Sequence, residues 1–203
     1  MANGETKYQI YLARKRQKQA VKTVQTGSEE TARQTTPTAN APIHECLVPA
    51  GLFEKGLGNL VFSRALENGR ISLSVFLVDV FCLGIKNAFS AIVTRDEYAI
   101  RARSWSSSEH LQPMRPECFR KLVEGAVAYA RELEFRPHAD YAEASRIFGN
   151  VDITTCSEQF EYGHNGKPFY MFGPNETRSQ ARNIVKQLER QFGPDGFEFF
   201  MVE

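Results

Sequence analysis

Apolar residues are concentrated in two neighbouring stretches of the chain, 59–66 and 70–80, which are separated by a short polar segment. Both stretches are apolar, the second is rich in β-branched residues, and the Asn68-Gly69 dipeptide between them is a pair that a type I′ turn favours. The pattern therefore predicts a β-hairpin with a two-residue loop.

The predicted loop also fixes which residues of the hairpin face one another. The expected pairs, from the turn outward, are Leu66 with Ile71, Phe62 with Val75 and Leu60 with Leu77. These residues would share one side of the sheet, which we take as the core side. Asp79 ends the row of odd positions on the second strand, where another apolar side chain was due.

Further elements follow from turn dipeptides, capping residues and apolar spacing. Asn165-Gly166 predicts a second hairpin between 158–162 and 168–172, and 197–202 predicts a final strand. Helices are expected behind Pro116 as far as Leu133, from Asp140 to Gly149, from Thr94 toward Arg103, and from about Glu176 to Phe192. Two hairpins and a C-terminal strand with about four helices indicate an α+β fold.

The composition is that of an ordinary globular protein, with 203 residues of which 42% are hydrophobic and 24% are charged. The formal net charge of +1 hides two unlike parts: seven basic and three acidic residues up to Pro42, then 18 basic and 21 acidic residues. We interpret 1–42 as a disordered, basic arm and flexible linker, and 43–203 as a single domain.

Between Lys7 and Lys22 the arm has six basic residues and no acidic residue, with Tyr8 and Tyr11 beside them. The six are Lys7, Arg14, Lys15, Arg16, Lys18 and Lys22. Such a segment can neutralise phosphates while its tyrosines stack on unpaired bases, or it can be a solvated tail that keeps the protein soluble.

A second basic feature lies on the last predicted helix, opposed only by Glu176 and Glu189. Its members recur every four residues: Arg178, Arg182, Lys186 and Arg190. Steps of four residues turn about 40° past a full helical turn, so these cations form one slanted ridge. The ridge indicates phosphate or an acidic partner, or else an ordinary hydrated surface.

A candidate catalytic group follows the hydrophobic strand directly, where a rigid scaffold can present reactive side chains. If the chain turns helical at Cys82, Lys86 lies on the same face and favours the thiolate form. The candidate catalytic residues are Asp79, Cys82, Lys86 and His138. The alternative is structural, with Asp79 capping or ion-paired and Cys82 in the core.

Metal and cofactor sites have little support in the sequence. His44, Cys46, Cys156 and His164 lack the paired spacing of zinc modules, so no metal site is predicted. No phosphate-binding loop, nucleophile elbow or dinucleotide fingerprint occurs, and no cofactor is expected. The four cysteines are interpreted as reduced thiols in a cytoplasm, because there is no CxxC pair and no secretory signal. No apolar run is long enough to span a membrane.

Several short motifs between Ile43 and Pro174 together resemble a family of uncharacterised bacterial proteins. They are Ile43-His44-Glu45-Cys46, Phe76-Leu77-Val78-Asp79 with Cys82-Leu83-Gly84-Ile85-Lys86, Phe135-Arg136-Pro137-His138 and Gly166-Lys167-Pro168-Phe169-Tyr170. The resemblance leaves out the basic arm. It implies a bacterial, cytoplasmic protein and supplies no activity.

The sequence favours an accessory protein that binds RNA, DNA or a ribonucleoprotein through the arm and the ridge. The first alternative is a Cys- or Asp-dependent hydrolase centred on Asp79, Cys82 and His138. The second is a protein-protein interaction module that uses the many aromatic residues.

Overall fold

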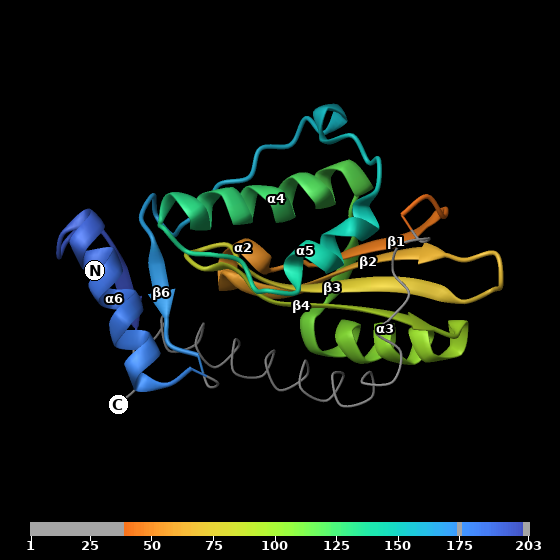
Figure 1. The fold of residues 1–203 in the computed structure, drawn as a ribbon, viewed down its shortest axis with the longest axis horizontal. Coiled ribbons are helices and arrows are strands. Elements are labelled where there is room, and N and C mark those ends of the chain that lie inside the picture. Colours follow the sequence, from red (N-terminus) through yellow and green to blue (C-terminus); the bar gives the residue numbers. More distant parts are fainter. Residues whose placement is uncertain (1–38, 174–175, 201–203) are drawn as a thin grey trace.

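A five-stranded antiparallel sheet forms the centre of the computed structural model, which describes residues 39–173 and 176–200 (Figure 1). The strand order is β4-β3-β2-β1-β5. The strands are β1 (Ile43–Pro49), β2 (Leu57–Ala65), β3 (Ile71–Asp79), β4 (Gly84–Val93) and β5 (Leu111–Pro113). The mixture of this sheet with helices confirms the predicted α+β class.

Helices cover both faces of the sheet, with α4 and α5 on one face and α3 on the other (Figure 1). The helices are α2 (Leu52–Lys55), α3 (Arg95–Glu109), α4 (Pro116–Glu132), α5 (Tyr141–Ala144) and α6 (Arg178–Phe192), with 3-10 turns η2 (Ser145–Phe148) and η3 (Ile153–Thr155). A small parallel pair, β6 (Phe169–Met171) and β7 (Glu198–Phe200), lies beside α6.

The helix starts follow the capping residues closely. Thr94 accepts a hydrogen bond from the Glu97 N–H while the Glu97 carboxylate accepts one from the Thr94 N–H, which is the capping box expected of α3. Thr177 and Gln180 form the same arrangement at α6, one residue beyond the predicted start. Asp140 accepts no capping bond, and α5 is a single turn that continues as η2.

The first hairpin forms, but its predicted register was wrong by one residue. Type I′ needs a positive φ at both loop residues, whereas only Gly69 (φ 78°) has one. The Leu66 N–H donates to the Arg70 carbonyl, so the loop holds three residues and Gly69 takes the left-handed position. Ala65 therefore faces Ile71, and Leu60 faces Phe76 rather than Leu77.

This shift changes the predicted core, because a slip of one residue exchanges the two faces of a strand. Even positions such as Leu60 and Phe76 pack under α4, and odd positions such as Val61 and Val75 pack with α3. All nine residues of β3 are buried. The sheet thus has a core on both sides, and the prediction of a core on only one side was wrong.

The second Asn-Gly pair makes the predicted turn, and β6 lies within the predicted strand 168–172, but the predicted strand 158–162 does not form. Asn165 (φ 53°) and Gly166 (φ 74°) both have positive φ, and His164 and Lys167 exchange backbone hydrogen bonds across them. The antiparallel pairing ends at that bridge. The Gly163 N–H donates to the Val80 carbonyl instead, and β6 pairs in parallel with β7, so residues 158–162 form no strand.

Candidate functional site

Asp79, the last residue of β3, lies at a tight turn that leads into β4. One carboxylate oxygen accepts hydrogen bonds from the backbone N–H groups of Phe81 (3.0 Å) and Cys82 (3.1 Å). Both Asp79 and Cys82 are completely buried. The carboxylate in the apolar row thus ties the turn together by satisfying two buried donors.

Lys86 lies on β4, so the helix considered at Cys82 was wrong: the chain turns and returns as a strand. The Lys86 ammonium pairs with Glu176 just before α6. The same carboxylate accepts hydrogen bonds from the Tyr170 hydroxyl (2.7 Å) and the Gly173 N–H (3.0 Å). Burial, reinforced by Glu176, raises the pKa of the Tyr170 hydroxyl. The ammonium thus serves to join α6 to the sheet.

His138 lies in the connection between α4 and α5, where its backbone N–H donates to the Ile85 carbonyl (2.9 Å). Its ring is partly exposed, and Nδ1 is 3.7 Å from an Asp140 oxygen. The structure therefore places Asp79 next to Cys82 in the interior and His138 at the surface. A substrate would reach the Cys82 thiol only if the surrounding core opened.

The ridge predicted on the last helix is present on α6. Arg178, Arg182, Lys186 and Arg190 are all exposed. Arg190 pairs with Glu134 at 2.9 Å, whereas the other three have no hydrogen bond or ion pair with any residue that the structure describes. Glu189 is the only acidic residue within α6. Three unpaired cations therefore remain available to an external anion.

The opposite side of α6 is held firmly against the domain. Ala181 and Leu188 are buried in a cluster with Cys82, Leu133 and Tyr170. Gln187 and Gln191 donate from the helix to the carbonyls of residues 133 and 132 at the end of α4 (2.8 and 2.7 Å). The ridge is thus presented by a fixed helix.

The six arm residues, Lys7, Arg14, Lys15, Arg16, Lys18 and Lys22, lie outside the described residues. Within the described part of the chain, no three His, Cys, Asp or Glu residues come close enough to hold a metal ion. Cys156 from the considered metal set is bonded to another cysteine instead.

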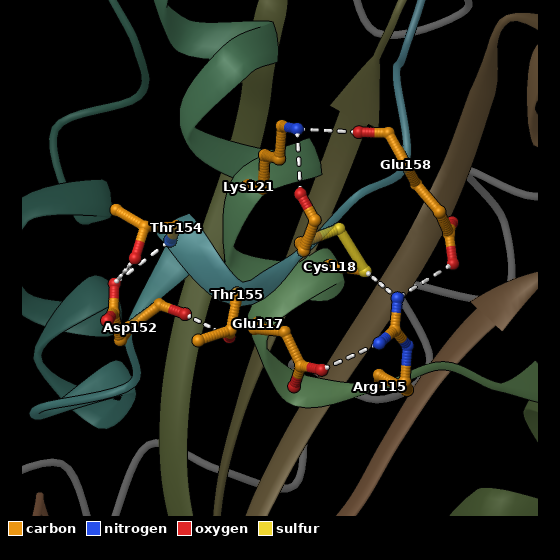
Figure 2. The surroundings of a disulfide bond; sticks show 9 residues. Arg115, Glu117, Cys118, Lys121, Asp152, Thr154, Thr155 and Glu158 are labelled. Carbon is orange, nitrogen blue, oxygen red and sulfur yellow. Dashed lines mark hydrogen bonds and ion pairs between the residues drawn. A yellow bond between two sulfur atoms is a disulfide. The ribbon is translucent and has the colours of Figure 1, made fainter.

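A disulfide joins Cys118 on α4 to Cys156 after η3, with Cα atoms 5.2 Å apart (Figure 2). The prediction of four reduced thiols was therefore wrong for these two. Figure 2 shows Lys121 donating to the Cys156 and Glu158 carbonyls, and Arg115 placed between Glu158 and the Cys118 sulfur. These contacts hold the irregular segment after η3 against α4. A separation of 38 residues gave no spacing motif that could have revealed the pair.

Sequence reasoning also missed a cavity of about 520 Å³ between α2 and residues 159–165. Phe53 and Glu54 of α2 form one side, and Phe160, Glu161 and His164 belong to the other. A smaller cavity of about 120 Å³ also borders Phe53 and Glu54 and extends toward β1 and Met114. The Phe-Glu dipeptide occurs in the sequence at 53–54 and 160–161, but also at 197–198 away from the cavity, so it did not mark the site.

Comparison of the chain with protein-family models, curated proteins and solved structures finds no match. The resemblance to a bacterial family therefore stays a prediction. In the described ranges, no helix combines the length and apolar character that crossing a membrane requires.

Proposed function

We propose that the protein is an accessory protein that binds nucleic acid, alone or within a ribonucleoprotein, and that α6 carries the described part of its contact surface. The observation that supports this most is the row of Arg178, Arg182 and Lys186, which are exposed and have no acidic partner among the residues of 39–173 and 176–200. An isolated hydrated helix face normally mixes its charges.

The spacing of these cations suits a phosphate backbone. Successive members are four residues apart, which is about 6 Å along a helix axis. That interval is comparable with the distance between successive phosphates of an extended strand. Each phosphate neutralised releases condensed counterions, which is the main source of sequence-independent affinity.

The basic arm at 1–42 would extend this surface. Its six cations and two tyrosines could add phosphate contacts and base stacking to those of the ridge. We propose a bacterial, cytoplasmic setting for this activity, in keeping with the family resemblance of the sequence.

The two alternatives receive less support from the geometry. A hydrolase would need its nucleophile at the surface, whereas Cys82 and Asp79 are buried and Lys86 is paired with Glu176. An interaction module would present a continuous apolar patch, but the large exposed apolar residues come from separate elements. They are Ile43, Phe53, Ile100, Phe192 and Phe199.

The salt dependence of binding tests the proposal. The affinity of the full chain for duplex DNA should fall linearly on a log-log plot against salt, with a slope of about 0.9 per phosphate neutralised. Replacing Arg182 and Lys186 by Gln should flatten the slope by about two units and weaken binding at low salt. Single-stranded RNA should show a change of about 1.4 units, because the slope per phosphate is about 0.7.

A matched control replaces two exposed arginines of α3, Arg95 and Arg103, by Gln, which removes the same charge from a different helix. This control should keep the wild-type slope. Equal losses in both double variants would refute the ridge as the contact surface, and no measurable affinity of the wild type at low salt would refute nucleic-acid binding altogether.

A further inference from the structure

The 520 Å³ cavity beside α2 has walls of a distinct chemical kind. Its aromatic lining consists of Phe53, Phe81, Phe160 and His164. The Phe53 and Phe160 rings are parallel, with an interplanar angle of 1° and centroids 6.0 Å apart. Phe81 is buried and its ring lies 5.1 Å from that of His164. Aromatic side chains from separate segments therefore border one space.

The polar lining of the cavity includes two carboxylates beside the amides of Gln159 and Asn165 and the His164 ring. Glu54 follows Phe53 on α2, and Glu161 follows Phe160 on the facing segment. Both carboxylates are exposed, and neither makes a hydrogen bond or ion pair with another residue in the described ranges. Among the residues that the structure describes, no lysine or arginine lines the cavity. Glu54 and Glu161 are the acidic residues of this described lining.

We propose that this cavity binds an organic cation, of the alkylammonium, quaternary ammonium or guanidinium class. The negative faces of aromatic rings attract such cations, and a carboxylate at the rim adds a direct charge contact. An anion would meet two carboxylates without a compensating cation, and a neutral apolar ligand would gain nothing from them. The arrangement of ring and carboxylate occurs twice, once on each side of the cavity.

The residues that form the cavity are held in place from several directions. The Tyr162 hydroxyl donates to the Leu122 carbonyl at 2.9 Å, and the Gly163 N–H donates to Val80. The Cys118–Cys156 disulfide anchors the segment just before Glu158. A site with fixed walls loses less conformational entropy when a ligand binds.

This inference is independent of nucleic-acid binding, because none of the residues of α6 lines the cavity. The cation could be a free small molecule or the side chain of a lysine or arginine in a peptide. Both sources share the same chemistry, so the experiment begins with small probes.

The full-length protein should be titrated with choline and, separately, with 3,3-dimethylbutan-1-ol, its uncharged analogue of nearly the same shape. The amide NMR signals of Gly163 and Asn165, which border the cavity, report on binding. We expect saturable shifts with choline and none with the alcohol at equal concentration. Saturation by both probes to a similar extent would overturn the proposal in favour of a merely apolar pocket.

Variants then assign the charge contribution. Replacing Glu54 and Glu161 by Gln should weaken choline binding about fivefold, in line with exposed ion pairs. Glu67→Gln removes an equally exposed carboxylate from the β2–β3 loop and should leave the affinity unchanged. Similar losses in both variants would overturn the assignment.

Short peptides distinguish the source of the cation. A trimethyllysine or arginine peptide that binds at least tenfold more tightly than choline, and displaces it, would identify a protein partner. Equal affinity would identify a small-molecule site. Absence of binding by choline, guanidinium and both peptides would refute the proposal.

Discussion

Glu109, at the end of α3, is a completely buried carboxylate. It accepts hydrogen bonds from the Asn59 N–H at 2.8 Å and from the Asn59 side-chain amide. Burial raises the pKa of Glu109, and the bonds from Asn59 together with the nearby Lys55 charge only partly oppose the shift. In the folded protein the ionised form is therefore disfavoured relative to the unfolded chain.

This shift gives a pH-dependent prediction. Because the folded-state pKa is raised for an acid, the folded chain holds more protons than the unfolded chain between the two pKa values. The resulting penalty is absent below the unfolded pKa and complete above the folded pKa. The free energy of unfolding of the wild type, relative to Glu109→Gln, should thus decrease as the pH rises above about 4.

Urea unfolding of both proteins across that pH range measures the difference directly. The Gln side chain keeps one acceptor for Asn59, and any constant cost of the substitution cancels in the comparison between pH values. A difference in unfolding free energy that stays flat with pH would contradict the raised pKa of Glu109.

Glu109 and Asp79 show what the sequence can reveal about single buried charges. Asp79 was singled out because it ends the row of apolar odd positions on its strand, and the structure gives it two buried donors. Glu109 ends a serine-rich helix in which apolar residues form no clear stripe. Its burial depends on β2, which lies 50 residues away in the chain, so no local pattern could indicate it.

At the scale of elements, the Cys118–Cys156 disulfide fastens the irregular segment after η3 to α4. It closes a loop of 38 residues, and a cross-link of that length restricts the unfolded chain enough to contribute about 2–4 kcal/mol. Reduction should therefore lower the free energy of unfolding by that amount.

Denaturant unfolding with and without dithiothreitol checks this prediction. The double variant Cys118→Ser with Cys156→Ser should resemble the reduced wild type and show no response to the reductant. Cys46 should not interfere, because burial raises the pKa of its thiol to about 12 and keeps it unreactive. An unchanged wild-type midpoint in reductant would contradict the stabilising role of the bond.

The elements that could be predicted were those whose ends or turns are fixed by residues close together in the sequence. Thr94 and Thr177 cap helices through contacts within four residues, and Asn165-Gly166 takes its turn with positive φ at both residues. The β2–β3 register depended instead on whether both loop residues, Asn68 and Gly69, or Gly69 alone took positive φ. Packing on both faces of the sheet decides between them. Strand β4 was missed because its polar residues, Lys86 and Asn87, interrupt the alternation.

The same distinction applies to the candidate sites. The α6 ridge was visible because all of its members belong to one helix. The cavity was not, since Phe53 and Phe160 come from segments more than 100 residues apart and meet only through the tertiary fold. Likewise, Lys86 meets Glu176 across 90 residues, which turned an expected catalytic cation into a structural one.

At the scale of the whole molecule, Arg64 of β2 links the residues just before β1 to the 3-10 turn η2. The buried Arg64 guanidinium donates to the Ala41 carbonyl and also to the carbonyls of Ile147 (2.6 Å) and Phe148 (2.9 Å). The Ala65 N–H donates to the Pro42 carbonyl at 2.9 Å. The domain therefore depends on residues just before β1, slightly earlier than the predicted boundary at Pro42.

Two truncations locate this boundary. Removing residues 1–38 should leave the thermal midpoint almost unchanged, because the composition of that segment offers no core. Removing 1–42 should destabilise the domain by about 1–3 kcal/mol, since the Arg64 guanidinium and the Ala65 N–H would each lose a carbonyl partner in a buried setting. Calorimetry of the two shortened chains beside the full chain measures both effects. If the shorter truncation alone abolished cooperative unfolding, the basic arm would have to contribute to the core, and its assignment as an independent nucleic-acid-binding segment would fail with it.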